Sequence, residues 1–300
     1  MKYYVDAITF LPHPGDTSKT YIIQQAIDST YTICPIIPLA SALLQLRYSI
    51  IDNNANNGQG AIISKHNVLL NAAFNMGILT IKHGNGRDWW IIVKRFNTNL
   101  FQRFLLTPNG ITGPTAQYYD TARCSDYWSW RYSTLTQKVV GFRGDGVYPT
   151  TRYMDVFDFD RCTGLFSNQQ LITINNYLPL PYSGACEISP NGRFLYAGVL
   201  DELHQFDLTA PNIQASAVVV DTLDSINFWS LHKSWFLMQA APDGKIYGVS
   251  FFGDTFLNVI HYPDSAGLAC MAVAKSISLP NNPNFALPHT PLYELGPLPG

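Results

Sequence analysis

The string Ser189-Pro190-Asn191-Gly192-Arg193-Phe194-Leu195-Tyr196 joins a tight-turn signal directly to an aromatic-rich strand. Proline fixes φ at the second turn position, asparagine tolerates the bridge region, and glycine adopts the left-handed conformation that ends the turn. Similar signals precede strands at 85–90, 145–148 and 242–247. The four turn glycines are 60, 46 and 52 residues apart, and they are Gly86, Gly146, Gly192 and Gly244. A repeat of roughly 40 to 50 residues predicts the blades of a β-propeller.

The repeat that contains Gly192 divides into four predicted strands, at 185–189, 193–199, 203–208 and 217–221. The following repeat divides in the same way, at 237–241, 245–251, 256–261 and 272–279. These strands are short apolar runs rich in Val, Ile, Tyr and Phe, which is the pattern of sheets covered on both faces. We therefore predict an all-β fold built from four-stranded antiparallel blades.

About five blades are expected in a single propeller domain that spans 1–300. Their approximate bounds are 1–72, 73–117, 134–178, 180–222 and 232–280, with an aromatic insertion at 118–132 and a short helical or irregular segment at 38–46. The tail 287–298 is expected to close the domain as an edge strand, because its prolines exclude it from a sheet centre. Rings of six or seven blades are commoner than rings of five, so an incomplete larger ring is also expected.

Composition excludes several classes of protein. The sequence has 47% hydrophobic and 13% charged residues and a formal net charge of −2. Such a chain has ample material for a core, and it lacks the basic excess that nucleic-acid binding requires. No apolar run approaches the roughly 20 residues of a membrane span, so no membrane insertion is expected. No glycine-rich phosphate loop or close Cys/His spacing occurs, so neither a cofactor nor a metal is predicted.

The five cysteines allow two interpretations. They are Cys34, Cys124, Cys162, Cys186 and Cys270, and no two of them form a CxxC pair. One interpretation makes them buried and inert. The other places a disulfide between Cys162 and Cys186, because both flank the same predicted outer strand.

Two strings make the sequence similar to a known family. They are Asn85-Gly86-Arg87-Asp88-Trp89-Trp90 and Phe157-Asp158-Phe159-Asp160-Arg161-Cys162-Thr163-Gly164. In combination they resemble the N-terminal β-propeller of large secreted Bacteroidetes proteins, which often end in a type IX secretion sorting domain. Its repeats are of the WD-like and YVTN-like kind, and the resemblance covers about residues 8–296.

The resemblance implies an extracellular or cell-surface location and a protein or polysaccharide partner. It supplies no catalytic residues. The sequence departs from the family in having no signal peptide and no upstream segment, so we expect at least one blade to precede it in the whole protein. It also has Phe142-Arg143-Gly144-Asp145-Gly146 where the family carries Ser-Pro-Asp-Gly.

Several acidic residues are candidates for chemistry. Asp88 lies between Arg87 and Trp89, and we expect it to accept hydrogen bonds in its own turn, with Arg87 as partner. Asp158 and Asp160 fall on one face of a predicted strand, where two carboxylates could bind a cation or act as acid and base. The dense oxygen spacing of a calcium loop is missing, so a solvated face is favoured. The seven histidines show no HxH or HExxH spacing.

The aromatic insertion is the best candidate for binding. Its candidate ligand-binding residues are Tyr127, Trp128, Trp130 and Tyr132. Exposed rings with few charges suit sugar stacking or protein contact, although the same rings could instead fill the space between two blades. We predict a non-catalytic binding or scaffold module that recognises a protein or glycan through loops at blade ends. The alternative is a propeller enzyme, a hydrolase or lyase that acts on a glycan or lactone at a central channel.

Overall fold

The computed structural model describes most of the chain. The described residues are 7–26, 43–75, 77–96, 98–119, 125–145, 151–175, 184–199, 202–222, 234–250, 253–283, 287 and 291–298. They form strands and two short 3-10 helices, η1 (Gln214–Ser216) and η3 (Gly267–Cys270), with no α-helix among them. No helix in this part of the chain is long and apolar enough to cross a bilayer. The all-β prediction is confirmed.

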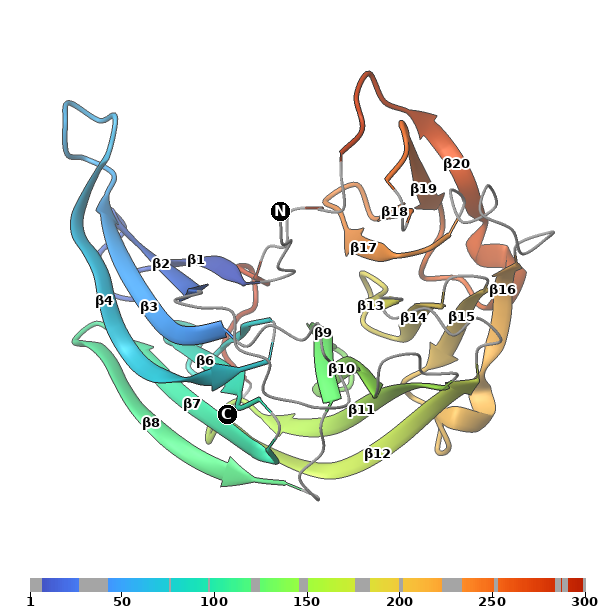
Figure 1. The fold of residues 1–300 in the computed structure, drawn as a ribbon, viewed down its shortest axis with the longest axis horizontal. Helices are drawn as coiled ribbons and strands as arrows, with labels where there is room; N and C mark the ends of the chain where they lie inside the picture. Colours follow the sequence, from blue (N-terminus) through green and yellow to red (C-terminus); the bar gives the residue numbers. More distant parts are fainter. Residues whose placement is uncertain are drawn as a thin grey trace. The chain divides into compact units, whose positions relative to one another are not determined.

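Twenty strands form five four-stranded antiparallel sheets (Figure 1). The first two sheets contain β1 (Ile8–Pro12), β2 (Lys19–Ala26), β3 (Leu43–Asp52), β4 (Ala61–Phe74), β5 (Leu79–Lys82), β6 (Trp89–Lys94), β7 (Leu100–Thr107) and β8 (Gly110–Tyr118). The third contains β9 (Ser125–Tyr132), β10 (Lys138–Asp145), β11 (Thr151–Asp160) and β12 (Leu165–Asn175). The last two contain β13 (Ala185–Ile188), β14 (Phe194–Val199), β15 (Glu202–Asp207), β16 (Val218–Thr222), β17 (Leu237–Ala240), β18 (Ile246–Val249), β19 (Phe256–Ile260) and β20 (Ala272–Ser278).

Strand order within every sheet follows the sequence, so each repeat folds as one meander. The predicted strands of the Gly192 repeat differ from β13–β16 by only one or two residues at their ends.

Two predictions were wrong. The segment 118–132 is no insertion, because it contains the end of β8 and the whole of β9. The tail was expected to form an edge strand, but its described residues, 287 and 291–298, form no strand. Leu298 N–H donates a backbone hydrogen bond to Gly84 O at 2.8 Å.

The chain divides into two compact units. The first unit consists of residues 1–3, 128–158 and 167–288, and the second of residues 4–127, 159–166 and 289–300. The first therefore contains most of the third sheet and the whole of the last two sheets. The second contains the first two sheets, the β11–β12 turn and the tail. A single ring that contains all five sheets stays a prediction.

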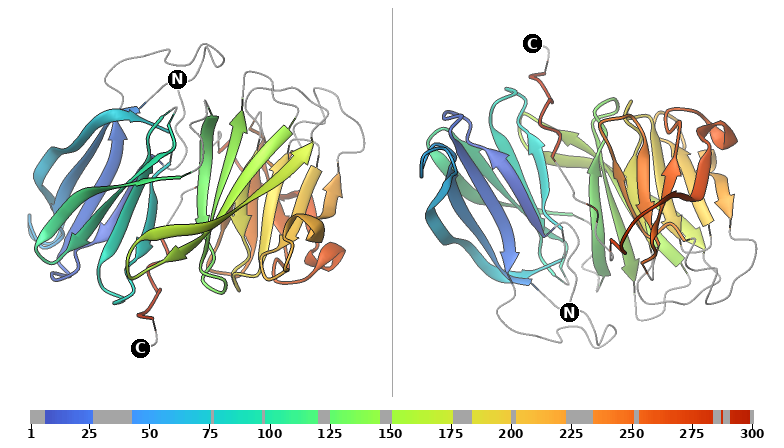
Figure 2. Two further views of the ribbon diagram at one scale, coloured as in Figure 1. Left: turned by 90° about the horizontal axis from the view of Figure 1, so that it is seen from below. Right: turned by 90° about the horizontal axis from the view of Figure 1, so that it is seen from above.

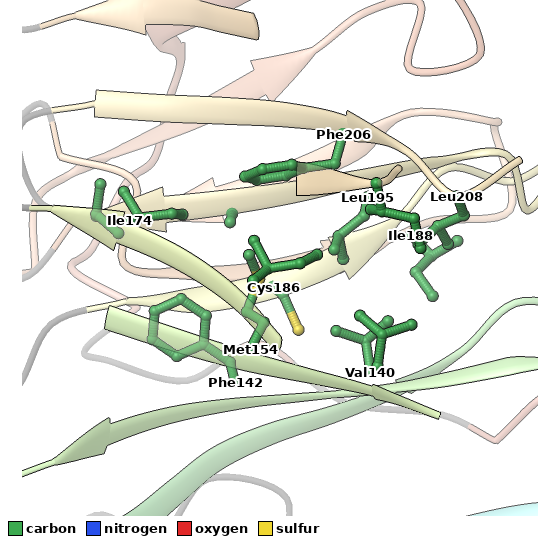
Figure 3. Close-up of a cluster of buried hydrophobic side chains, with 14 residues drawn as sticks. Val140, Phe142, Met154, Ile174, Cys186, Ile188, Leu195, Phe206 and Leu208 are labelled. Carbon is green, nitrogen blue, oxygen red and sulfur yellow. The ribbon is translucent and has the colours of Figure 1, made fainter. Parts of the chain in front are cut away.

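The core of the first unit lies between facing sheets. Side chains of β10, β11 and β12 pack against those of β13, β14 and β15 (Figure 3). Cys186 lies in this cluster, together with Phe142, Met154, Leu195 and Phe206. The opposite face of the β13–β16 sheet packs against the β17–β20 sheet. Because both faces are covered, every residue of β13 and β14 is buried, which explains the continuous apolar runs in the sequence.

Glutamine side chains brace neighbouring sheets. Gln117 of β8 donates to Phe166 O (2.8 Å) and accepts from Phe166 N–H (3.1 Å). Gln214 of η1 accepts from Thr173 N–H (2.7 Å) and donates to Thr173 O (3.2 Å). Gln205 of β15 makes the same two kinds of bond to the backbone between β19 and β20. A primary amide can donate and accept at once, so each glutamine replaces a backbone partner that the neighbouring segment lacks.

The fourth strand of several sheets carries an irregularity. His66 (φ 55°) in β4, Gly113 (φ 116°) in β8 and Lys275 (φ 53°) in β20 adopt positive φ, and the pairing register shifts near each of them. Side chains of the third strand satisfy the displaced backbone: Ser49 Oγ accepts from His66 N–H (3.0 Å), and Asn258 Oδ1 accepts from Lys275 N–H (2.8 Å). Such bulges twist the free edge of a sheet (Figure 2) and discourage edge-to-edge aggregation.

Candidate interaction surface

Two of the four predicted aromatic binding residues are not exposed. Trp130 and Tyr132 are buried in β9. The Trp130 ring lies directly over Gly141 of β10, where a Cβ atom would come within 2.4 Å of it. The side chains of Tyr127 and Trp128 lie outside the described residues. The burial of Trp130 and Tyr132 therefore argues against an exposed patch at these two residues, and the Trp130 ring packs within its own sheet and not only between two blades.

The other face of β9 is polar and bonds to the next sheet. Ser129 Oγ accepts from Cys186 N–H at 3.2 Å, and Ser133 Oγ donates to Gly192 O at 2.5 Å. Arg131 lies between the two serines and faces Glu187. Alternating side chains of a strand share a face, so Ser-x-Arg-x-Ser places three polar groups in a row. This alternation was the sequence signal that would have identified β9 as a strand.

Arg131 ties together three sheets of the first unit. Its Nε donates to Glu187 Oε2 at 2.8 Å, its Nη1 to Trp130 O at 2.9 Å and its Nη2 to Met238 O at 3.2 Å. The Arg131 and Glu187 side chains are only 8% and 6% exposed. A buried guanidinium that donates to a carboxylate and two carbonyls has a structural role. Sequence reasoning did not identify this pair, because its members are 56 residues apart.

The turn predictions hold wherever the structure describes them. Gly86 (φ 71°), Gly192 (φ 79°) and Gly244 (φ 78°) adopt the left-handed conformation. Gly146 lies outside the described residues.

Asp88 is a structural residue of its turn, as predicted. Arg87 Nε donates to Asp88 Oδ1 and Asn85 Nδ2 to Asp88 Oδ2, each at 2.8 Å. Burial opposes ionisation of Asp88, but the bonds from Arg87 and Asn85 outweigh it and hold the pKa of the carboxyl below its usual value.

The acidic residues of β11 separate into different roles. Asp155 is buried in an ion pair with Arg143 (Nε to Oδ2, 2.8 Å). Asp158 is partly exposed and pairs with Lys138 across the strands. Asp160 is exposed and accepts from Cys162 N–H (2.8 Å) and the Thr163 hydroxyl (2.7 Å) in the turn. Among the described residues no group of three His, Cys, Asp or Glu could hold a metal ion.

The proposed disulfide is not formed. Cys162 and Cys186 are both outside any disulfide, and they belong to different compact units. Cys186 lies in the core beside Ser129, whereas Cys162 is exposed in the β11–β12 turn. Burial raises the pKa of the Cys270 thiol, so this buried cysteine is a poor nucleophile. The prediction of buried cysteines thus holds for Cys186 and Cys270 and fails for Cys162.

The two strings that carried the family resemblance interlock in the second unit. Trp90 Nε1 donates to Arg161 O at 2.8 Å, and the Trp90 ring lies against Gly164, at which a Cβ would come within 2.8 Å. Arg161 in turn donates to the carbonyls of Lys82 (2.8 Å) and His83 (3.1 Å). Their joint occurrence in the sequence therefore has a physical cause, because one turn is the packing partner of the other.

One face of the first sheet, called the open face below, exposes apolar side chains at β1. Alternation in β1 buries Thr9 and Leu11, while Ile8 and Phe10 are 48% and 46% exposed. Phe10 pairs with the half-buried Ile22 of β2. By contrast, every residue of β6 in the neighbouring sheet is buried.

The open face continues across the outer strands. Ile62 of β4 is 52% exposed and pairs with the half-buried Ile51 of β3, and Val68 of β4 is 49% exposed and pairs with Arg47. We define the open face by six apolar side chains, namely Ile8, Phe10, Ile22, Ile51, Ile62 and Val68. Four strands about 4.8 Å apart, taken over the eight-residue length of β2, give this side of the sheet an area on the order of 400 Å², which the six apolar side chains share with Thr20, Gln24 and Arg47. The largest apolar patch of a typical monomer has a similar size and is often functional.

Comparison with known proteins identifies the fold but no family. No protein-family model matches the sequence, and no curated protein sequence matches it. A proposed 6-phosphogluconolactonase from Bacteroides fragilis is 12% identical, with a TM-score of 0.54 over 90% of this chain and 84% of that one. A proposed 6-phosphogluconolactonase from Bacteroides uniformis is 13% identical, with a TM-score of 0.42 over 90% of this chain and 85% of that one. Together with the five sheets, the first likeness shows a β-propeller of four-stranded antiparallel blades.

Proposed function

We propose that the chain is a non-catalytic binding or scaffold module that contacts another protein through the open face. The observation that carries this proposal is the half exposure of Ile8, Phe10, Ile62 and Val68 on one side of the first sheet, whose other side is buried at Thr9, Leu11 and Ile23. Removing such side chains from water is favourable by about 25 cal/mol per Å² of apolar surface, so the face gains free energy from any partner that covers it.

The chemistry of the open face favours a protein over a polysaccharide. Phe10 is its one aromatic side chain, and the others are isoleucine and valine. Sugar recognition needs flat rings flanked by hydrogen-bonding groups, whereas branched aliphatic side chains pack well against another sheet. The area is about half of the roughly 800 Å² that each partner buries in a standard interface, so the open face would form the apolar centre of a larger contact.

We place the module outside the cell, as part of a larger secreted or surface protein of the Bacteroidetes type. The support is the family resemblance of the strings at 85–90 and 157–164. Tyr127 and Trp128, at the start of β9, remain the candidates for a glycan partner.

The electrostatics of the described carboxylates favour binding over catalysis. Asp88, Asp160, Asp207 and Asp243 have pKa values below their usual range, and each accepts hydrogen bonds from residues of its own or an adjoining turn. A general base works best with a pKa near the operating pH, and lowering a carboxyl pKa moves it away from that value. The neighbours that would favour the lactonase alternative are 12% and 13% identical, and that degree of likeness carries the fold alone.

The test is site-specific photo-crosslinking in the cells that make the protein. A photoreactive phenylalanine analogue replaces Phe10 in one variant and Val219, which is 39% exposed on β16, in the matched control. The proposal predicts a discrete protein adduct from position 10 that the control lacks. Equal adduct patterns at both positions would contradict the docking role. Hydrolysis of sugar lactones by the purified chain, above the rate in buffer, would contradict the non-catalytic role.

A further inference from the structure

Four Asn-Gly pairs in the sequence are potential sites of a spontaneous modification. They are Asn57-Gly58, Asn85-Gly86, Asn109-Gly110 and Asn191-Gly192. In such a pair the backbone nitrogen of glycine can attack the side-chain amide carbon of asparagine, because glycine has no Cβ to obstruct the approach and leaves the backbone free to rotate. The reaction needs a free asparagine side chain and a glycine N–H released from its hydrogen bond. The structure distinguishes the four pairs on both counts.

The pair at Asn85 is locked. Asn85 Oδ1 accepts from the backbone N–H groups of Arg87 and Asp88, both at 3.0 Å, and Nδ2 donates to Asp88 at 2.8 Å. Gly86 N–H donates to His83 O at 2.9 Å. Cyclisation would break all of these bonds.

The pair at Asn191 is locked in the same way. Asn191 Oδ1 accepts from the Ser189 hydroxyl (2.8 Å) and from Arg193 N–H (2.9 Å). Gly192 N–H donates to Ser189 O at 2.7 Å. A Cβ on Gly192 would lie 2.8 Å from Leu135 N, so this turn also has little room to rearrange.

The pair at Asn57 is the least constrained of the four. Asn57 is exposed at the tip of the β3–β4 hairpin, and its side chain makes no hydrogen bond to the described residues. Gly58 N–H donates to Asn54 O at 3.3 Å, a longer and weaker bond than those of Gly86 (2.9 Å) and Gly192 (2.7 Å), and no atom lies within 4 Å of the Cβ position of Gly58. Asn56 (φ 54°) and Asn57 (φ 57°) also hold positive φ, a conformation that costs non-glycine residues free energy and favours local opening.

The pair at Asn109 is intermediate. Asn109 is exposed like Asn57, but Gly110 sits opposite Thr107 in the β7–β8 pairing. The Thr107 hydroxyl donates to Gly110 O at 3.3 Å and accepts from Asn109 N–H at 3.2 Å, so it holds the backbone of this turn to β7.

We propose that Asn57 is the site at which this protein deamidates spontaneously. The Gly58 nitrogen loses its proton to a base and bonds to Asn57 Cγ, and the Cγ–Nδ2 bond breaks as Nδ2 takes up a proton from the base and leaves as ammonia. Water then opens the cyclic imide at either carbonyl and leaves aspartate or isoaspartate at position 57. The product adds one negative charge to the net charge of −2 and, in its isoaspartate form, lengthens the main chain at the hairpin tip.

The experiment follows conversion at each site in the folded chain. The purified protein is kept at mildly alkaline pH, and aspartate and isoaspartate are quantified by peptide mass spectrometry. Conversion at Asn57 is expected to be at least about tenfold faster than at Asn85 or Asn191, because opening the two locked turns costs the free energy of several hydrogen bonds. In the urea-unfolded chain the three rates should converge, since the local structure is lost.

Two variants complete the test. Asn57→Ser should remove the product while leaving the circular dichroism spectrum unchanged. Ser189→Ala removes one bond to Asn191 and should accelerate conversion there. Conversion at Asn85 or Asn191 as fast as at Asn57 in the folded chain, or conversion at Asn109 with Asn57 intact, would overturn the proposal.

Discussion

Removing the guanidinium of Arg131 should destabilise the first unit strongly. In Arg131→Met the Glu187 carboxylate, 6% exposed, keeps its burial and loses its cation, while the carbonyls of Trp130 and Met238 lose their donor. Breaking one side of a buried pair costs about 3–5 kcal/mol, mostly because a charge is left uncompensated. Since a domain is stable by only about 5–15 kcal/mol, the variant should fold but unfold much more readily.

The double variant Arg131→Met/Glu187→Met separates charge from packing. It leaves no buried charge, so its cost should fall well below the sum of the two single variants, with a coupling of about 2 kcal/mol or more. The matched control is Arg193→Met, which removes an exposed pair with Asp207 and should cost at most about 1 kcal/mol.

Native-state hydrogen exchange at the β14 amides measures these free energies within the first unit. This readout does not require the two units to unfold together. A loss below about 1 kcal/mol for Arg131→Met, or strict additivity in the double variant, would refute the idea that the pair braces the three sheets.

Three further outcomes are expected. Gly141→Ala should cost about 1–3 kcal/mol and change the near-UV circular dichroism, because the new methyl group collides with an indole ring; an unchanged spectrum would argue against that contact. Lys245 and Tyr247 donate to Asp243 and hold the pKa of its carboxyl at about 2, below the ordinary value, so the stabilisation that it provides is complete above about pH 4 and is lost as the pH falls towards 2. An NMR titration should show this pKa rise in Tyr247→Phe, and no rise would remove the assigned cause. Gln117→Leu should cost about 1–3 kcal/mol and accelerate amide exchange at the start of β12, whereas unchanged exchange would show that the glutamine brace is idle.

The sequence predicted the blade repeat because its turns have strict backbone requirements. Only glycine adopts φ near 75° without strain, so Gly86, Gly192 and Gly244 show where hairpins reverse. Strands that follow such turns were located to within a few residues, as β14 and β18 show. These turns and strands depend on residues that are adjacent in the sequence, so they can be predicted from it.

The third blade was misread because its first strand has two different faces. Trp130 and Tyr132 resemble an exposed aromatic patch when their number alone is considered. Their burial depends on Gly141, nine residues or more away, which leaves a space that an indole fills. The polar face with Arg131 is equally non-local, since its partner Glu187 lies in the next sheet. The open face had no local signal either, because exposure depends on whether a neighbouring sheet is present.

Thiol labelling tests the open face most directly. In Phe10→Cys and Ile91→Cys, a maleimide reagent reports accessibility at a position on β1 and at the buried centre of β6, with peptide mass spectrometry separating each site from the exposed Cys162. The account predicts rapid labelling at position 10 in the isolated chain, protection at position 91 until the protein unfolds, and protection at position 10 in the cells that make the protein. Protection of position 10 in the isolated chain would show that the protein covers this face by itself, and the docking surface would not exist.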